Sequence, residues 1–166
     1  IGEEFDYINR VDEEIVEIGS ATPLAKIFKY TLNKGLSGME NFIGIPARLG
    51  GLVVMNASCF GRSISQILEE VKIIDSYGNL RILKKEDIWF GYRSSSLKVK
   101  KNIVISARLR FKNMDNIKDR LKFYLLKRLS EQDFDSPSAG CVFKNPSNMS
   151  AGYLIEQCGL KGFIYR

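Results

Sequence analysis

The chain has 166 residues, 45% of them hydrophobic, 11% aromatic and 27% charged, which is typical of a globular fold and argues against disorder. Histidine is absent, which excludes Ser-His-Asp and Cys-His catalytic systems and HExxH zinc proteases. The first 20 residues hold seven acids and one base, so residues 21–166 carry +12 within a total charge of +6. This basic body favours an anionic partner: nucleic acid, an acidic lipid surface or a phosphorylated small molecule.

The cysteines and the first residues of the chain indicate the cellular compartment in which the protein is expected. The three cysteines are odd in number and form no CxxC pair, which favours a reducing environment. The opening IGEEFDYINR has neither the basic nor the apolar region of a signal peptide. No apolar run approaches the roughly 18–20 residues that a membrane span needs. We therefore expect a soluble, cytoplasmic protein.

Residues 13–38 predict a strand followed by a helix. Thr22 is a candidate N-cap, Pro23 suits the first helical position and Gly35 suits the position after the end. One buried helical face is predicted from residues at helical spacing: Leu24, Ile27, Phe28 and Leu32.

Two later stretches predict antiparallel strands. Residues 71–85 form two apolar runs around Ser-Tyr-Gly-Asn, the pattern of a hairpin. Apolar and polar residues alternate strictly in residues 102–112, so one face of this strand is predicted to be buried and the other exposed to solvent. The predicted buried face comprises Ile103, Ile105, Ala107, Leu109 and Phe111.

Two helices are predicted in the C-terminal third. The first spans residues 115–132, with Ile117, Leu121, Tyr124, Leu125 and Leu129 on its apolar face. The second begins at a Ser150 cap and stops at Gly159. Together the elements predict an α+β fold, an antiparallel sheet with packed helices.

Residues 38–61, GMENFIGIPARLGGLVVMNASCFG, are rich in glycine. Glycines allow a backbone to approach a ligand closely, and a following helix N-terminus offers amide donors to a phosphate. The stretch matches neither GxxxxGK[ST] nor GxGxxG. From composition alone it is either a phosphate-binding segment or a set of turns.

Residues 90–101, FGYRSSSLKVKK, gather polar side chains around Tyr92 and Arg93. An arginine fork suits a carboxylate or a phosphate. A solvated loop with an ordinary surface arginine is the alternative.

Residues 138–146, SAGCVFKNP, surround Cys141 with small and polar residues. A thiol is mostly protonated at neutral pH and can give a proton to a carbanion or enolate beside it. Most free cysteines are small buried hydrophobes, and this is the alternative.

Four stretches, in order, resemble the UDP-N-acetylenolpyruvoylglucosamine reductase family of bacterial cell-wall synthesis. They are GLSGMENFIGIPARLGGLVVMNASCFG, FGYRSSSLK, SAGCVFKNP and SAGYLIEQCGLKG, and the resemblance covers roughly residues 16–163. It implies a bound FAD, NADPH as co-substrate and a UDP-sugar substrate, which is reduced from UDP-N-acetylglucosamine enolpyruvate to UDP-N-acetylmuramate. We expect no nucleic acid, no membrane and no obligate protein partner.

The resemblance also assigns site residues. Arg93 would hold the substrate carboxylate and stabilise an enolate, and Cys141 stands where the family usually has its proton-donating serine. The residues implied to contact FAD are Gly44, Ile45, Pro46, Gly50, Gly51, Asn56, Gly61 and Ile103. Those implied to position the substrate are Tyr92, Gln132, Lys144 and Asn145.

The resemblance implies two domains and an incomplete protein. Residues 1–132 would be an FAD-binding domain of the vanillyl-alcohol-oxidase-like type, and residues 133–166 the beginning of a substrate-binding domain. The short loop after Tyr-Arg is similar to the compact branch of the family. We expect an internal fragment, inactive by itself, that lacks the family's N-terminal region and its C-terminal carboxylate.

Three residues depart from the pattern that the resemblance implies. Ala47 and Arg48 replace a glycine and a small residue, and Phe60 replaces a common tyrosine. Another FAD-linked oxidoreductase could share the cofactor domain but would lack the Tyr-Arg and KNP pieces. A basic, non-enzymatic nucleic-acid binder is the other alternative, although no RNA- or DNA-binding signature is present.

Overall fold

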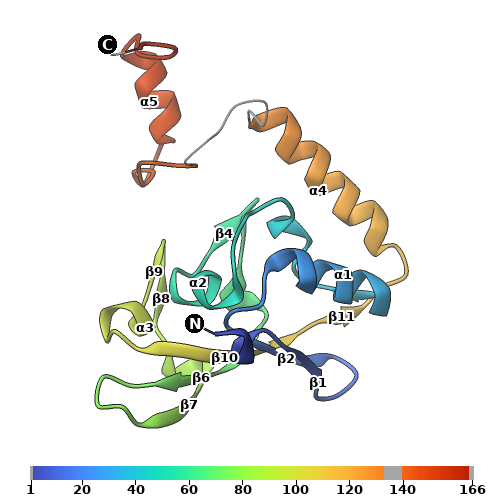
Figure 1. The fold of residues 1–166 in the computed structure, drawn as a ribbon. Helices are drawn as coiled ribbons and strands as arrows, with labels where there is room; N and C mark the ends of the chain where they lie inside the picture. The colour runs from blue at the N-terminus through green and yellow to red at the C-terminus, as the bar shows by residue number, and fades with distance from the viewer. Residues whose placement is uncertain (1, 133–139, 165–166) are drawn as a thin grey trace. The chain divides into compact units, whose positions relative to one another are not determined.

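The computed structural model describes residues 2–132 and 140–164 and divides into two compact units, Ile1–Glu131 and Gln132–Arg166. The first unit is built on a five-stranded antiparallel sheet in the order β1-β2-β10-β6-β7 (Figure 1). Its strands are β1 (Ile8–Arg10), β2 (Ile15–Gly19), β6 (Leu68–Ile74), β7 (Leu80–Lys84) and β10 (Ile103–Arg110). Sheet and helices together confirm the predicted α+β class.

Helices and small hairpins complete the two units. The α-helices are α1 (Leu24–Lys34), α2 (Leu49–Val54), α3 (Ser96–Val99), α4 (Ile117–Glu131) and α5 (Ala151–Gln157). The short strands pair as β3 (Leu36–Ser37) with β11 (Lys112–Asn113), β4 (Ser58–Cys59) with β5 (Arg62–Ser63), and β8 (Phe90–Gly91) with β9 (Ser94–Ser95). Single 3-10 turns are η1 (Glu3–Phe5), η2 (Glu40–Phe42), η3 (Ile64–Gln66) and η4 (Lys85–Asp87). No helix of the described ranges is both long and apolar enough to span a bilayer.

Local sequence signals set several element ends. Helix α1 stops at Gly35, which has the left-handed φ of 64° that the prediction required. Its N-cap, however, is Pro23; Thr22 was the wrong choice, because its hydroxyl donates to the Tyr7 carbonyl instead. The β6–β7 hairpin is confirmed, and the Asp75 carboxylate accepts the backbone N–H groups of its turn.

The core lies between one face of the sheet and the helices packed on it. Figure 1 shows α1 and α2 on the same side of the sheet. Large side chains buried there include Phe42 and Phe111, and β2, β6 and β10 contribute Val16, Ile18, Leu68, Val71, Ile73, Ala107 and Leu109. Burying each of the larger side chains stabilises the fold by about 1.5–3 kcal/mol relative to leaving it exposed.

Because β10 contains a β-bulge, its predicted buried face is partly wrong. The pairing with β6 shifts between Val104 and Ser106, so one extra residue, Ile105, stands in β10. The alternation therefore changes phase: Val104 is buried at 4% exposure, whereas Ile103 is 53% exposed. The buried positions Ala107, Leu109 and Phe111 agree with the prediction, and Ile103 and Ile105 do not.

The second unit contains α5 and the residues around it. The Ser150 hydroxyl accepts the Tyr153 N–H at 3.0 Å, and Gly159 has φ 70°, so both predicted ends of this helix are confirmed. The Asn145 side-chain oxygen accepts the Ala151 N–H at 3.0 Å and adds a second bond to the helix start.

Candidate functional site

A turn in the middle of the glycine-rich segment packs against the β2–α1 turn. The Leu49 and Gly50 N–H groups donate to the Thr22 and Ser20 carbonyls, and the Leu24 N–H donates to the Ala47 carbonyl. The Arg48 guanidinium donates to the Ala21 carbonyl. Four bonds therefore fix the two turns side by side. The side chain of Arg48 is used for this packing.

These two turns border an open groove. It has a volume of about 620 Å³ and is lined by Pro23, Leu24, Ala25, Ile45, Pro46, Ala47, Arg48 and Gly51. Three predicted cofactor residues, Ile45, Pro46 and Gly51, thus share one surface. A Cβ added at Gly51 would have no described atom within 4 Å, so this glycine leaves the groove open. A Cβ at Gly50 would lie 3.0 Å from the Ser20 Cβ, which makes Gly50 a packing glycine.

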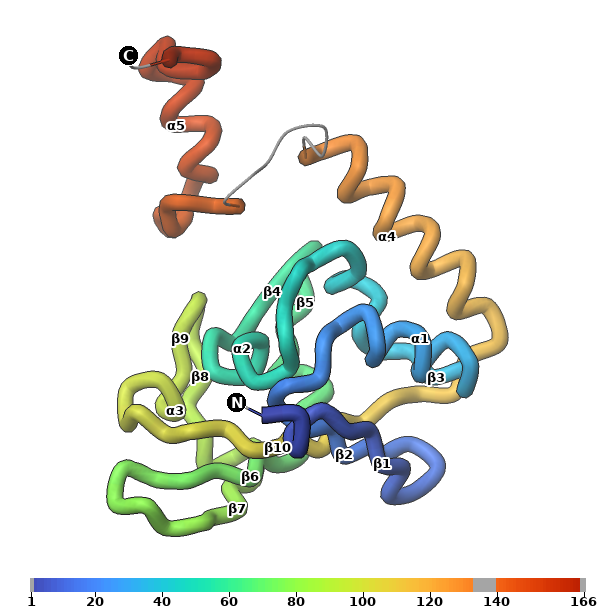
Figure 2. The backbone as a smooth tube through the Cα atoms, viewed as in Figure 1, coloured from blue at the N-terminus to red at the C-terminus, as the bar shows by residue number. Residues whose placement is uncertain are grey.

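The end of the segment is tied to the Tyr-Arg hairpin. The Asn56 side-chain nitrogen donates to the Gly91 carbonyl at 3.1 Å, and the Ser95 hydroxyl donates to the Val54 carbonyl at 2.6 Å. The Arg93 Nη1 donates to the Ser58 hydroxyl at 3.0 Å. Figure 2 shows α2 beside the β4–β5 and β8–β9 hairpins that carry these residues. The fold therefore brings Arg93 and Asn56, which are 37 positions apart, into one region.

Both residues are held in an unusual backbone conformation. Asn56 has φ 42° and Arg93 has φ 54°, in the left-handed region that non-glycine residues seldom adopt. Such conformations cost about 1–3 kcal/mol and persist where surrounding contacts enforce them, often at functional sites. The Arg93 guanidinium also lies 5.4 Å from the centre of the Tyr92 ring, within cation–π range. The aromatic ring and Ser58 together fix the direction of the arginine fork.

Asn56 also leaves one polar atom available. The residue is 8% exposed, and its Oδ1 has no hydrogen-bond partner among the described residues. A buried amide oxygen without a donor costs about 1–3 kcal/mol. The oxygen can accept an N–H from a ligand, and the pyrimidine part of a flavin carries such a donor at N3. Asn56 does not line the groove at Gly51, so the open space at Gly51 and this oxygen are two separate features, each of which fits a flavin.

The remaining predicted residues occupy other positions. Gly44 has φ 81° and packs against Arg128, and Gly61 has φ 74° with no described atom within 4 Å of an added Cβ. Ile103 stands on the exposed face of the sheet, whereas α2 packs on its buried face, so its contact with a cofactor stays a prediction. In the second unit Gln132, Cys141, Lys144 and Asn145 are all exposed.

Sequence reasoning missed the residues that support this site. Ser58 and Ser95 lie in the glycine-rich and Tyr-Arg stretches, yet nothing in the sequence marks them as partners of Arg93 and Val54. Arg128 lies on a helix face that the spacing predicts to be apolar, and it is 4% exposed. Within the described ranges, no three His, Cys, Asp or Glu side chains are grouped to hold a metal.

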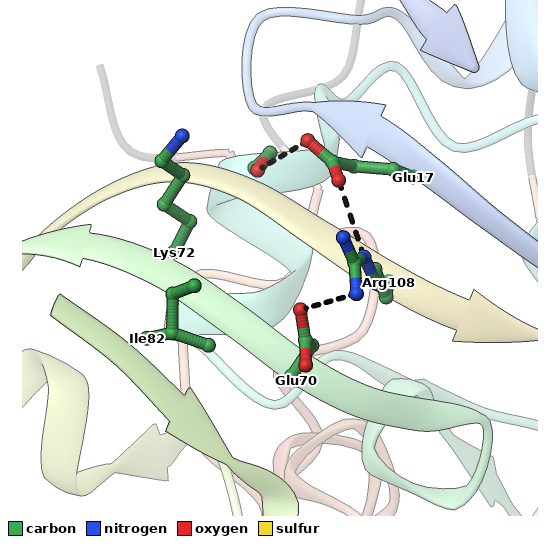
Figure 3. A pocket seen from close by; sticks show the side chains of 6 residues that line it. Glu17, Glu70, Lys72, Ile82 and Arg108 are labelled. Atoms are coloured by element: carbon green, nitrogen blue, oxygen red, sulfur yellow. Dashed lines mark hydrogen bonds and ion pairs between the residues drawn. The ribbon is translucent and has the colours of Figure 1, made fainter. Parts of the chain in front are cut away.

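A second polar cluster lies on the outer face of the sheet (Figure 3). It borders a small pocket of about 60 Å³. Arg108 forms ion pairs with Glu17 at 3.2 Å and with Glu70 at 3.0 Å, and the Tyr7 and Ser106 hydroxyls donate to Glu17. One arginine and two glutamates pair with one another across β2, β10 and β6. This cluster therefore stabilises the sheet and is a poor candidate for a ligand site.

The cluster gives the fold a pH dependence. Burial raises the pKa of Glu17, but the bonds from Tyr7 and Arg108 outweigh it, so the pKa lies below its ordinary value of 4.5. A carboxyl with a lowered pKa stabilises the fold above its unfolded pKa, and this contribution is lost as pH falls through the folded pKa. Urea unfolding at pH 7 and in steps below pH ~4.5 should show Glu17→Gln less stable at pH 7 and less sensitive to acid. An acid sensitivity identical to wild type would contradict this assignment.

Three comparisons place the chain among known proteins. Residues 132–165 match the family model described as UDP-N-acetylenolpyruvoylglucosamine reductase, C-terminal domain. The chain is 38% identical over 155 residues to the UDP-N-acetylenolpyruvoylglucosamine reductase of Clostridium botulinum (strain Okra / Type B1), covering 92% of this chain and 51% of that protein. It is 35% identical over 153 residues to the reductase of the same name from Chlamydia abortus, covering 92% and 52%.

A solved structure agrees with these relatives. The crystal structure of UDP-N-acetylenolpyruvylglucosamine reductase from Thermus caldophilus superposes with a TM-score of 0.81 at 36% identity, covering 96% of this chain and 58% of that one. The chain spans about half the length of the curated relatives it matches. Similarity that extends over nine-tenths of the chain, in sequence and in fold, relates the chain to about half of the length of the UDP-N-acetylenolpyruvoylglucosamine reductases that it matches.

Proposed function

We propose that the protein containing this chain is an FAD-dependent enzyme that uses NADPH to reduce UDP-N-acetylglucosamine enolpyruvate to UDP-N-acetylmuramate, a cytoplasmic step of bacterial peptidoglycan precursor synthesis. One observation carries the proposal: the glycine-rich segment and the Tyr-Arg hairpin are tied together through Asn56–Gly91 and Ser58–Arg93. The segment predicted to bind the cofactor and the hairpin that carries Arg93 thus lie together in the first unit.

The first unit would hold FAD as a domain of the vanillyl-alcohol-oxidase-like type. Support comes from the groove lined by Ile45, Pro46 and Gly51 and from the unpartnered, buried Oδ1 of Asn56. Bound FAD would supply hydride transfer from NADPH to the enolpyruvyl group. The net charge of +12 over residues 21–166 favours three anionic ligands, FAD, NADPH and the UDP-sugar.

Arg93 and Cys141 would act on the substrate itself. The Arg93 fork, held by Ser58 and the Tyr92 ring, would bind the enolpyruvyl carboxylate and stabilise the negative charge that develops when C3 is reduced. Cys141, which is exposed in the second unit, would then give the proton from its sulfur to C2. Tyr92, Gln132, Lys144 and Asn145 would position the sugar and its diphosphate.

The proposal is tested by purifying the protein expressed from its complete gene. The protein should carry FAD and should oxidise NADPH in proportion to added enolpyruvyl UDP-sugar. NADPH oxidation that is independent of this sugar would favour another FAD-linked oxidoreductase, and a protein that cannot be loaded with FAD would refute the proposal. Residues 1–166 alone should show no turnover.

Gly51 offers a sharper test of where FAD binds. Because Gly51 lies inside α2 and its added Cβ meets no described atom, Gly51→Ala should raise the stability of the FAD-free protein by about 0.5–1 kcal/mol. The same methyl group would enter the groove and should weaken FAD binding. Thermal unfolding and FAD titration measure the two effects. Unchanged FAD affinity would place the cofactor elsewhere.

A further inference from the structure

Arg128 is a buried cation on the helix α4. The helix exposes most of its side chains, including Leu125 and Leu129, which were predicted to be on its apolar face. Arg128 is only 4% exposed, although arginine is seldom fully buried unless it is paired. The contacts of the Arg128 guanidinium explain this burial.

The guanidinium of Arg128 binds backbone oxygens of the glycine-rich segment. Its Nε donates to the Ile43 carbonyl at 2.7 Å, and its Nη2 lies 3.2 Å from the Asn41 carbonyl and 3.1 Å from the Cys59 sulfur. The carbonyls of Asn41 and Ile43 lie three residues and one residue before Gly44, and the sulfur belongs to the β4–β5 hairpin. One planar fork thus joins the start of the segment to its end, which a flexible point charge such as lysine cannot do as well.

The neighbouring contacts form a continuous row along α4. Positions 120, 124 and 128 are four residues apart and share a helix face. Arg120 pairs with the buried Glu40 at 3.4 Å, Tyr124 lies 5.5 Å from the Phe60 ring, and the Arg128 guanidinium lies 5.3 Å from the same ring. This row fixes η2 and the β4–β5 hairpin to the helix.

Gly44 explains why the segment can lie this close to Arg128. A Cβ at Gly44 would come within 2.9 Å of the Arg128 Cδ, and the residue has φ 81°. A glycine is therefore required both for the turn and for the approach of the arginine. The next residues along the chain, Ile45 and Pro46, line the groove.

We propose that Arg128 is a positioning residue, which holds the backbone of residues 41–46 in the conformation that binds the flavin. The inference rests on the proposed function, because it concerns the same groove. Arg128 itself is not proposed to contact the substrate. The effect passes through the carbonyls of Asn41 and Ile43 to the groove wall that follows them.

The test compares three variants of the protein expressed from its complete gene. Arg128→Met removes the fork, Arg128→Lys keeps the charge without the fork, and Lys122→Met removes an exposed cation from the same helix as a control. FAD affinity is measured by flavin fluorescence below the melting temperature of each FAD-free variant. The visible circular dichroism of bound flavin reports how the ring is held.

We expect Arg128→Met to weaken FAD binding by roughly 10- to 100-fold, as the loss of bonds to a charged donor implies, and to change the flavin spectrum. Arg128→Lys should lie between this variant and wild type, and Lys122→Met should match wild type. If Arg128→Met does not fold, the lysine variant carries the test. Normal affinity and an unchanged spectrum in the folded Arg128 variants overturn the inference alone. A wild-type protein that binds no FAD overturns the proposed function as well.

Discussion

Arg93→Ala is expected to lower kcat/KM for the enolpyruvyl UDP-sugar by about 10²–10³-fold, the usual effect of removing one group that stabilises developing negative charge. The reduction of bound flavin by NADPH should be nearly unchanged, because Arg93 would act on the sugar's carboxylate and not on the nicotinamide. Stopped-flow measurement of the two half-reactions separates these effects.

The control for this variant is Arg81→Ala. Arg81 pairs with Asp75 at 2.7 Å in the β6–β7 hairpin, so its loss removes one surface guanidinium from the same unit. Surface ion pairs contribute about 0–1 kcal/mol, and both half-reactions should stay normal. If Arg93→Ala also proceeds at the wild-type rate in the sugar half-reaction, the role proposed for Arg93 is wrong.

Cys141→Ala is expected to slow the reduction of the sugar by about 10²–10⁴-fold, the range for removing a general acid. Cys141→Ser should retain much more activity, because a hydroxyl also carries a transferable proton. Cys158→Ala is the matched control, since Cys158 is likewise an exposed free cysteine of the second unit. The measurement is product formation in a single turnover of NADPH-reduced protein. Normal turnover of Cys141→Ala would remove the proton-donor role.

Local rules predicted the main elements correctly. Gly35 and Gly159 take the left-handed conformation that ends a helix, Ser150 caps α5, and β6 and β7 pair as a hairpin around Ser-Tyr-Gly-Asn. Each of these signals acts over a few neighbouring residues, so the sequence alone carries it. The antiparallel sheet follows from the alternation in residues 102–112 and the hairpin before it.

Long-range contacts set the features that the sequence did not reveal. The bulge at Ile105 depends on the pairing of β10 with β6, and it moved Ile103 to the exposed face. The positive φ of Arg93 depends on the ties between the β8–β9 hairpin and the segment after α2. The burial of Arg128 depends on the carbonyls of residues 41 and 43 and on the Phe60 ring, which all lie against α4. None of these contacts leaves a periodic pattern.

Single-turnover oxidation of the reduced protein tests the central claim most directly: that the groove beside Gly51 and the arginine fork of Arg93 serve one bound flavin. The FAD-loaded protein, expressed from its complete gene, is reduced with NADPH and mixed anaerobically with the enolpyruvyl UDP-sugar while flavin absorbance is followed. Rapid return of the oxidised flavin spectrum, slowed by about 10²–10³-fold in Arg93→Ala, is the expected result. A reduced flavin that persists in the presence of the sugar would contradict the claim.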